Sequence, residues 1–124
     1  MRSGVQKMAI ANPGTAPYGN TVKQVLMRME NWPEIENKLV YGANVGHAFQ
    51  YAQSEVAQAA FVSLSLALSE KGKEGCYWMI HGAAPVEQKA CTVSYSQNNL
   101  AAERFLQYSV SMKTASVRKN FGYQ

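Results

Sequence analysis

The sequence has 124 residues, 47% hydrophobic and 16% charged, a length and balance that predict a globular domain and exclude a disordered chain. Lys and Arg total 12 against 8 Asp and Glu, so the net charge of +4 suits an anionic partner without indicating nucleic acid. The sequence contains no apolar run of the roughly 18 residues that a membrane helix needs, and its first residues lack the apolar run of a signal peptide.

Strands and helices are predicted to alternate from the N-terminus. Residues 8–12 are short, apolar and followed by Pro-Gly, which is typical of a buried strand. The next segment has apolar residues at helical spacing, and Pro17 suits the first position of that helix, which we expect to end near Asn31. Residues 38–41 form the second predicted strand. Asn44 is a good N-cap for a helix over residues 45–52.

The second half of the chain has a less regular pattern. Residues 59–63 are predicted as a third buried strand, followed by a short turn or helix over 64–68 and a solvated loop over 71–75. Two more strands are predicted at 76–80 and 91–95. Asn98 or Asn99 can cap a helix that has Ala101, Phe105 and Tyr108 on one stripe, and a second short helix is expected over 111–120.

The order strand, helix, strand, helix, strand predicts an α/β fold with a parallel βαβαβ unit. Such sheets bind ligands at the carboxyl ends of their strands. Three groups of donors are expected there. If Pro17 opens its helix, the N–H groups of Tyr18 and Gly19 point out of the helix start. If Asn44 caps the next helix, those of Val45 and Gly46 do the same, and Ser63 adds a hydroxyl after the third strand.

These donors are all neutral, which favours a rigid oxyanion that carries little or no proton. The same edge has no aligned general base, nucleophile or metal-ligand set, so the sequence predicts a binding site and no enzyme. The alternative is structural, because every βαβ unit has helix N-termini at this edge and most of them bind nothing in particular.

Three segments, IANPGTAPYGNTVKQVL, WPEIENKLVYGANVGHAFQYA and AAFVSLS, together resemble the second half of the periplasmic molybdate-binding proteins of bacterial ABC transporters. The resemblance runs from about Lys7 to the C-terminal FGY. It implies one lobe of a type II periplasmic-binding-protein fold and a molybdate or tungstate ion as ligand, with no cofactor and no metal site. It also implies ion contacts from the backbone N–H groups of Tyr18 and Val45 and from Ser63. The flanking residues that would support them are Ala16, Gly19, Asn44 and Gly46.

Nothing in the sequence corresponds to the first lobe of that family. We therefore expect a fragment or a truncated product that binds molybdate weakly or not at all as a monomer. Residues 1–95 would form the ligand-binding lobe. Residues 96–124 would form helices that pack on the missing lobe or on a partner chain. The resemblance implies a periplasmic protein that works with a membrane permease, whereas the lack of a signal peptide predicts the cytoplasm if the chain is complete.

A homodimer through the C-terminal helices is a further hypothesis, because Phe105, Leu106, Tyr108 and Phe121 would lose the surface of the first lobe. The alternative function is therefore an interaction or self-association module that has lost anion binding. Lys113, Arg118 and Lys119 are interpreted as a solvated helix face, although a basic surface is the one feature that would favour nucleic acid.

The remaining notable side chains are interpreted as structural. Cys76 and Cys91 are expected to be reduced thiols in the core, with a single disulfide as the alternative. His47 is either an anion contact or a partly exposed helix residue. His81 is assigned no role. The sequence predicts core packing for the following residues: Met27, Met29, Met79, Trp32 and Trp78.

Overall fold

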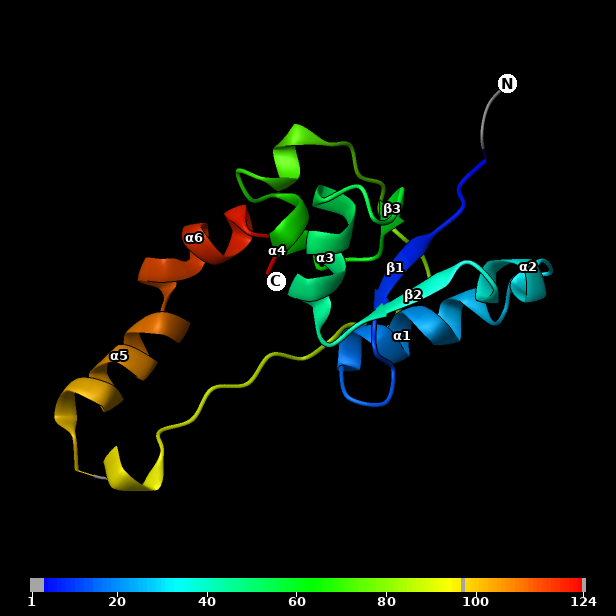
Figure 1. The fold of residues 1–124 in the computed structure, drawn as a ribbon. Coiled ribbons are helices and arrows are strands. Elements are labelled where there is room, and N and C mark those ends of the chain that lie inside the picture. The colour runs from blue at the N-terminus through cyan, green and yellow to red at the C-terminus, as the bar shows by residue number, and fades with distance from the viewer. Residues whose placement is uncertain (1–3, 97, 124) are drawn as a thin grey trace. The chain divides into compact units, whose positions relative to one another are not determined.

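The computed structural model describes residues 4–96 and 98–123 (Figure 1). By its internal contacts the chain divides into two compact units, Met1–Val86 and Glu87–Gln124. The first unit holds a small sheet covered by helices, and the second consists of helical segments.

The sheet has three strands, β1 (Met8–Ala11), β2 (Leu39–Gly42) and β3 (Ala59–Ala60), in the order β2-β1-β3. Both pairings are parallel, with Ala11 opposite Gly42 and Ala9 opposite Ala60. The predicted parallel βαβαβ arrangement is therefore confirmed. The third strand is shorter than the predicted 59–63, because the backbone after Phe61 leaves the sheet and turns into a helix at Ser63.

Four α-helices follow these strands in the first unit, and α1 and α3 cover opposite faces of the sheet (Figure 1). Their bounds are α1 Pro17–Leu26, α2 Trp32–Glu36, α3 Val45–Gln53 and α4 Leu64–Ala67. A short 3₁₀ helix, η1 (Gly72–Glu74), forms the exposed loop predicted after α4. The N-terminal position of Pro17 in α1 and the capping of α3 by Asn44 are confirmed.

The end of the first helix differs from the prediction. α1 stops at Leu26 rather than near Asn31, and a separate helix, α2, begins at Trp32. A proline just beyond a helix, as Pro33 is relative to the predicted end near Asn31, favours termination. A proline is equally suited to the first turn of a helix, where its missing N–H has no intrahelical partner. Here Pro33 lies in the first turn of α2.

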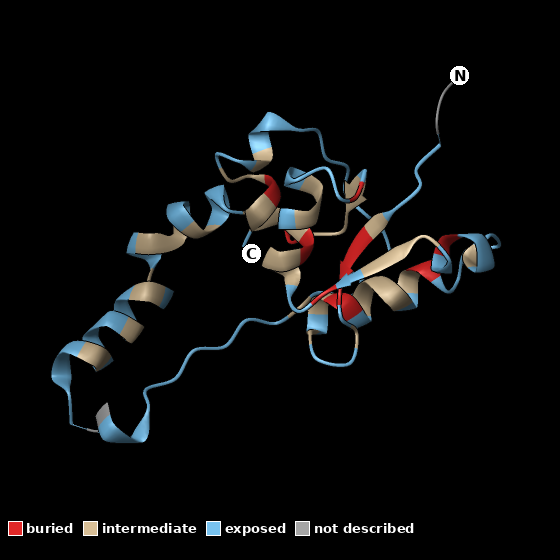
Figure 2. Cartoon of the chain, in the orientation of Figure 1, coloured by how far each residue is buried: buried red, intermediate tan, exposed pale blue. Residues whose placement is uncertain are grey.

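The buried hydrophobic residues of the first unit lie mainly on β1 and on the helices around it (Figure 2), and most of them are alanines. Ala9 and Ile10 are fully buried, and Ala9, Ala48 and Ala57 form one cluster. The side chains of Val40, Tyr51 and Ala60 pack against this cluster. Alanines at these positions leave room for α3 to lie close to the sheet.

The two additional strands predicted at 76–80 and 91–95 are wrong. Both segments are irregular, apart from a 3₁₀ turn, η2, at Ser94–Ser96. An apolar extended segment becomes a strand only where a neighbouring strand takes its backbone hydrogen bonds. The sheet within the described residues has three strands, and neither segment pairs with it.

Several residues predicted in the core are exposed for the same reason. Cys76 and Cys91 are free, exposed thiols, so both the buried pair and the alternative disulfide are wrong for this structure. Trp78 is 81% exposed, and Trp32 is only half-buried. The methionines Met27, Met29 and Met79 are also exposed. Apolar character predicted burial at these positions, but burial requires a second surface to pack against.

The second unit contains α5 (Leu100–Val110), the 3₁₀ helix η3 (Met112–Thr114) and α6 (Ala115–Asn120). Asn99, rather than Asn98, caps α5, because its Oδ1 accepts hydrogen bonds from the N–H groups of Ala101 and Ala102. Arg118 of α6 donates to the carbonyl oxygens of Ser109 and Ser111 at 2.7 and 3.1 Å and so ties α6 to the end of α5.

No helix among the described residues combines the length and the apolar character needed to cross a membrane.

Candidate functional site

The turn after β1 is organised by Asn12, which sequence analysis did not single out. Its side-chain oxygen accepts a hydrogen bond from the N–H of Gly14 at 2.9 Å, and its carbonyl oxygen accepts from Thr15 and Ala16. An asparagine before Pro-Gly is a known signal for this kind of turn, so the pattern could have been found. The turn brings the chain from the carboxyl end of β1 directly to the start of α1.

The start of α1 carries three of the predicted site residues. Ala16 is the N-cap, with an extended backbone and no side-chain cap. Tyr18 and Gly19 lie in the first turn. Gly19 is buried, and a Cβ built on it would lie 2.1 Å from the carbonyl oxygen of Ala11. Only glycine therefore lets the first turn of α1 rest on the end of β1.

The start of α3 carries the next three predicted residues. Asn44 is the N-cap, and its Oδ1 accepts from the N–H of His47 at 2.9 Å while its carbonyl oxygen accepts from the N–H of Ala48. Among the described residues, no partner is found for the N–H groups of Val45 and Gly46. These two donors lie at the positive end of the helix dipole, where negative charge is favoured.

Ser63 follows β3 and is the N-cap of α4. It is 6% exposed, and its Oγ accepts from the N–H of Leu66 at 3.4 Å. Its Oγ also lies 2.9 Å from the Oγ of Ser65, with either hydroxyl able to donate. When Ser65 donates, the Ser63 proton is available to a ligand, because a hydroxyl can accept two hydrogen bonds and donate one.

The seven predicted residues thus lie at three helix starts, each of which follows one strand of the same parallel sheet. Since the carboxyl ends of parallel strands share one edge, the three helix starts are gathered at that edge. All the donors they offer are neutral. His47, by contrast, is half-buried and its ring is engaged within the turn, a role that the sequence did not reveal.

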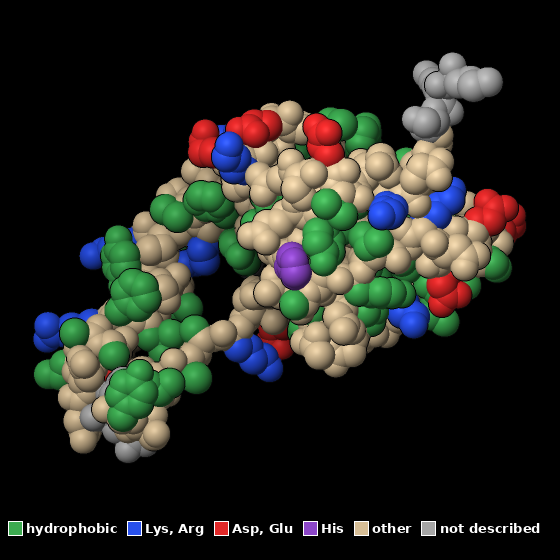
Figure 3. Space-filling model, in the orientation of Figure 1, with side chains coloured by type: hydrophobic (Ala, Val, Ile, Leu, Met, Phe, Trp, Pro, Cys, Tyr) green, Lys and Arg blue, Asp and Glu red, His purple; other side chains and the backbone are tan. Residues whose placement is uncertain are grey.

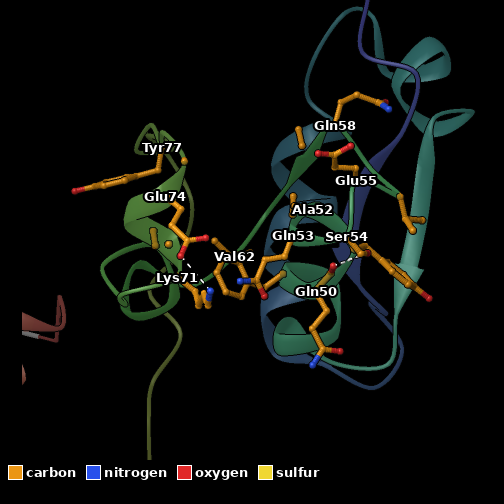
Figure 4. A pocket seen from close by; sticks show the side chains of 18 of the residues that line it. Gln50, Ala52, Gln53, Ser54, Glu55, Gln58, Val62, Lys71, Glu74 and Tyr77 are labelled. Atoms are coloured by element: carbon orange, nitrogen blue, oxygen red, sulfur yellow. Dashed lines mark hydrogen bonds and ion pairs between the residues drawn. The ribbon is translucent and has the colours of Figure 1, made fainter.

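A cavity of about 1100 Å³ lies in the first unit between α3 and the segment around η1 (Figure 4). Its polar lining includes Gln50, Gln53 and Glu55 from α3 and the residues after it, and the ion pair of Lys71 with Glu74 at 3.1 Å. None of the seven predicted residues lines it. A second cavity, of about 310 Å³, is bounded by the Asn12 turn, Lys23 and Tyr41, and it also excludes them.

The groups gathered at the three helix starts are uncharged hydrogen-bond donors. Among the residues that the structure describes, no group of three or more His, Cys, Asp or Glu side chains is placed to hold a metal ion. The helix starts present N–H and O–H donors, which suits an anion that accepts hydrogen bonds.

The sequence of the chain is similar to the sequences of known solute-binding proteins. The profile of the family described as bacterial extracellular solute-binding protein matches residues 1–124. The chain is 32% identical over 98% of its length to the molybdate-binding protein ModA of Azotobacter vinelandii and covers 50% of that protein. It is 26% identical to ModA of Rhodobacter capsulatus, of which it covers 49%, so it spans about half the length of these curated relatives.

The fold of the chain is also similar to parts of solved structures. The periplasmic molybdate-binding protein of Azotobacter vinelandii superposes with a TM-score of 0.81 at 25% identity, over 98% of this chain and 55% of that one. The substrate-binding domain of a putative molybdenum ABC transporter from Clostridium difficile matches with a TM-score of 0.61 at 21% identity, over 99% of this chain and 54% of that one. The α/β lobe expected from the sequence is therefore confirmed.

Proposed function

The chain belongs to the bacterial extracellular solute-binding protein family, and we propose that it forms an oxyanion-binding lobe of the molybdate- or tungstate-binding component of an ABC transporter. The observation that carries this proposal is the gathering of three helix starts at one sheet edge, in a chain that aligns over nearly its whole length with molybdate-binding proteins.

The proposed ligand contacts are the backbone N–H groups of Tyr18 and Val45 and the hydroxyl of Ser63. The flanking residues Ala16, Gly19, Asn44 and Gly46 hold the two backbone turns in place. Neutral donors suit molybdate, because a tetrahedral dianion offers acceptors on every side and needs no proton from the protein. The helix dipoles add a favourable potential without a charged side chain.

The chain provides one side of such a site. Donors that remain open to water contribute less than donors enclosed between two lobes, because water competes for the same anion. We therefore propose weak oxyanion binding by the chain alone. In this proposal residues 1–95 bind the ion and residues 96–124 serve as docking helices. The protein acts in the periplasm and delivers its ion to a membrane permease.

Calorimetric titration of the purified chain tests this proposal. Molybdate and tungstate are titrated separately, with sulfate as the control anion, in a buffer free of phosphate. Heat with molybdate or tungstate and none with sulfate is the expected result. The absence of heat with both metal oxyanions, at protein concentrations that would detect millimolar affinity, would refute oxyanion binding by this chain.

A second candidate function, self-association, is favoured by the surface of the second unit. None of the helices α5, η3 and α6 contains a buried residue, and Figure 3 shows hydrophobic side chains exposed on them beside several Lys and Arg side chains. Phe105, Tyr108 and Phe121 are 72%, 52% and 46% exposed. Exposed apolar patches of this kind are typical of interaction surfaces.

Sedimentation equilibrium over a hundredfold concentration range tests the second candidate. A homodimer that Phe105→Glu converts to monomer is the expected result, with Arg104→Glu on the same helix as the control for added charge. A monomer at every concentration would exclude self-association through this face.

A further inference from the structure

The first turn of α3 contains a reciprocal pair of hydrogen bonds. The side chain of Asn44 accepts from the N–H of His47 at 2.9 Å, and Nδ1 of His47 accepts from the N–H of Ala43 at 3.3 Å. The pattern resembles a capping box, in which the side chain at the third helical position accepts from the backbone N–H of the N-cap, except that the N–H here belongs to Ala43, the residue before the N-cap. Here an imidazole takes the place of the usual carboxylate or amide.

This pair decides which donors of the turn remain for a ligand. The N–H groups of Ala43, His47 and Ala48 are all used inside the turn. Those of Val45 and Gly46, which lie between them in the sequence, have no partner among the described residues. The side chain of His47 therefore accepts from the N–H that precedes Asn44 in the chain. Asn44, as the N-cap, accepts from the N–H groups that follow Gly46.

The ring of His47 is itself held in place. Its centroid lies 4.7 Å from that of Tyr51, one helical turn further along α3, and the two rings are tilted by 42°. Tyr51 packs against the core cluster of Ala9, Ala48 and Ala57. The imidazole is thus connected through Tyr51 to the rigid centre of the first unit, and an acceptor at Nδ1 requires the proton of the neutral ring to be on Nε2.

We propose that His47 is the positioning residue of the oxyanion site: through Nδ1 it fixes the turn from Gly42 to Gly46 and so aims the N–H of Val45 at the ion, with the N–H of Gly46 beside it. The inference rests on the proposed function for its ligand. His47 does not bind the ion with Nδ1, since that atom already accepts from Ala43. Its role is to make the two backbone donors rigid before the ion arrives, which lowers the entropic cost of binding.

Nitrogen NMR of the isotopically labelled chain tests the geometry without a ligand. The expected spectrum of the neutral ring of His47 shows its proton on Nε2. His47→Leu should shift the amide signals of Ala43, Val45 and Gly46 and raise their mobility. A proton on Nδ1, or amide signals in the leucine variant that match those of the wild type, would overturn the proposal even if the chain binds molybdate well.

Affinity measurements test the consequence. Loss of one neutral hydrogen bond and of the order it imposes should weaken molybdate binding by His47→Leu about threefold to tenfold. His47→Gln, whose side-chain oxygen can accept from the same N–H, should bind within about twofold of the wild type. Equal losses in both variants, or no loss in the leucine variant, would contradict the positioning role.

The two hypotheses fail in different ways. If the wild-type chain binds no molybdate or tungstate, the proposed function fails, and the NMR measurement still decides whether His47 orders the turn. If the wild type binds and the glutamine variant does not rescue binding, the positioning role fails and the proposed function stands. Thermal unfolding of both variants shows whether each is fully folded at the temperature of the titration. A loss of affinity in a fully folded variant is then an effect on the site.

Discussion

The first turn of α1 lies against the end of β1 so closely that a Cβ on Gly19 would be 2.1 Å from the carbonyl oxygen of Ala11. No real Cβ approaches a backbone oxygen to this distance, and the atom it would meet cannot rotate away. The contact fixes where the helix begins relative to the strand, and with it the place of the backbone N–H of Tyr18.

Gly19→Ala should therefore push the start of α1 away from β1. Overpacking of this kind costs about 1–3 kcal/mol of unfolding free energy, and it should also weaken oxyanion binding. Chemical denaturation measures the first effect. The control is Gly14→Ala, where the added Cβ would meet only the Asn12 side chain at 3.4 Å, an ordinary contact. Equal stability of the two variants would contradict the close packing.

Val45→Pro removes one proposed ligand contact while sparing the fold. Val45 is the first residue of α3, where proline is tolerated, and the preceding Asn44 already has the extended backbone (φ −151°, ψ 178°) that a following proline requires. A hydrogen bond to a charged partner contributes about 1.5–3 kcal/mol, so molybdate affinity should fall more than tenfold.

Two matched control variants are needed to interpret the result for Val45→Pro. Val45→Ala keeps the N–H and should bind as the wild type does. Leu100→Pro makes the same change at the first position of α5, in the other unit, and should leave affinity unaltered. Calorimetry of all three gives the comparison, and wild-type affinity in Val45→Pro would remove Val45 from the site.

Ser63→Ala should affect both stability and binding. The hydroxyl caps α4, and losing an N-cap costs about 1 kcal/mol. The same change removes a donor proposed for the ion. Ser65→Ala leaves the cap in place and is the control, with a smaller loss of stability expected. If the two variants lose affinity equally, the donor is the hydroxyl pair rather than Ser63 by itself.

Asn99→Ala should destabilise α5 by about 1 kcal/mol, because its side chain satisfies two N–H groups at the helix start. Asn98 is the matched control. It has a φ of 71°, a conformation that glycine adopts without strain, so Asn98→Gly should leave the helix intact. Thermal unfolding followed by circular dichroism distinguishes the two. A larger effect at Asn98 would mean that the cap has been assigned to the wrong asparagine.

Cys76 and Cys91 should both react rapidly with a thiol reagent such as dithionitrobenzoate in the native protein, since both are exposed. Two equivalents released in one fast phase, at the rate seen in denaturant, is the expected result. The single variants Cys76→Ser and Cys91→Ser should each release one equivalent, which assigns the signal to each thiol. Protection of either thiol until unfolding would show that it is buried.

Local patterns predicted the elements that are determined locally. The strand at β1, the helix opened by Pro17 and the cap at Asn44 all follow from residue types that favour one backbone conformation. The same patterns placed the seven candidate site residues at helix starts. Whether those residues contact an ion stays a prediction, because it depends on a ligand.

Long-range packing decided the rest. The segments at 76–80 and 91–95 have strand-like sequences but lack a paired neighbour in the described part of the chain, so Trp78 and both cysteines are exposed. Pro33 could end one helix or begin the next, and the structure shows that it begins α2. The sequence by itself determined the parallel α/β order and the family. Only the tertiary structure decided which apolar residues are buried and that His47 closes the α3 turn, because both require atoms from separate segments to meet.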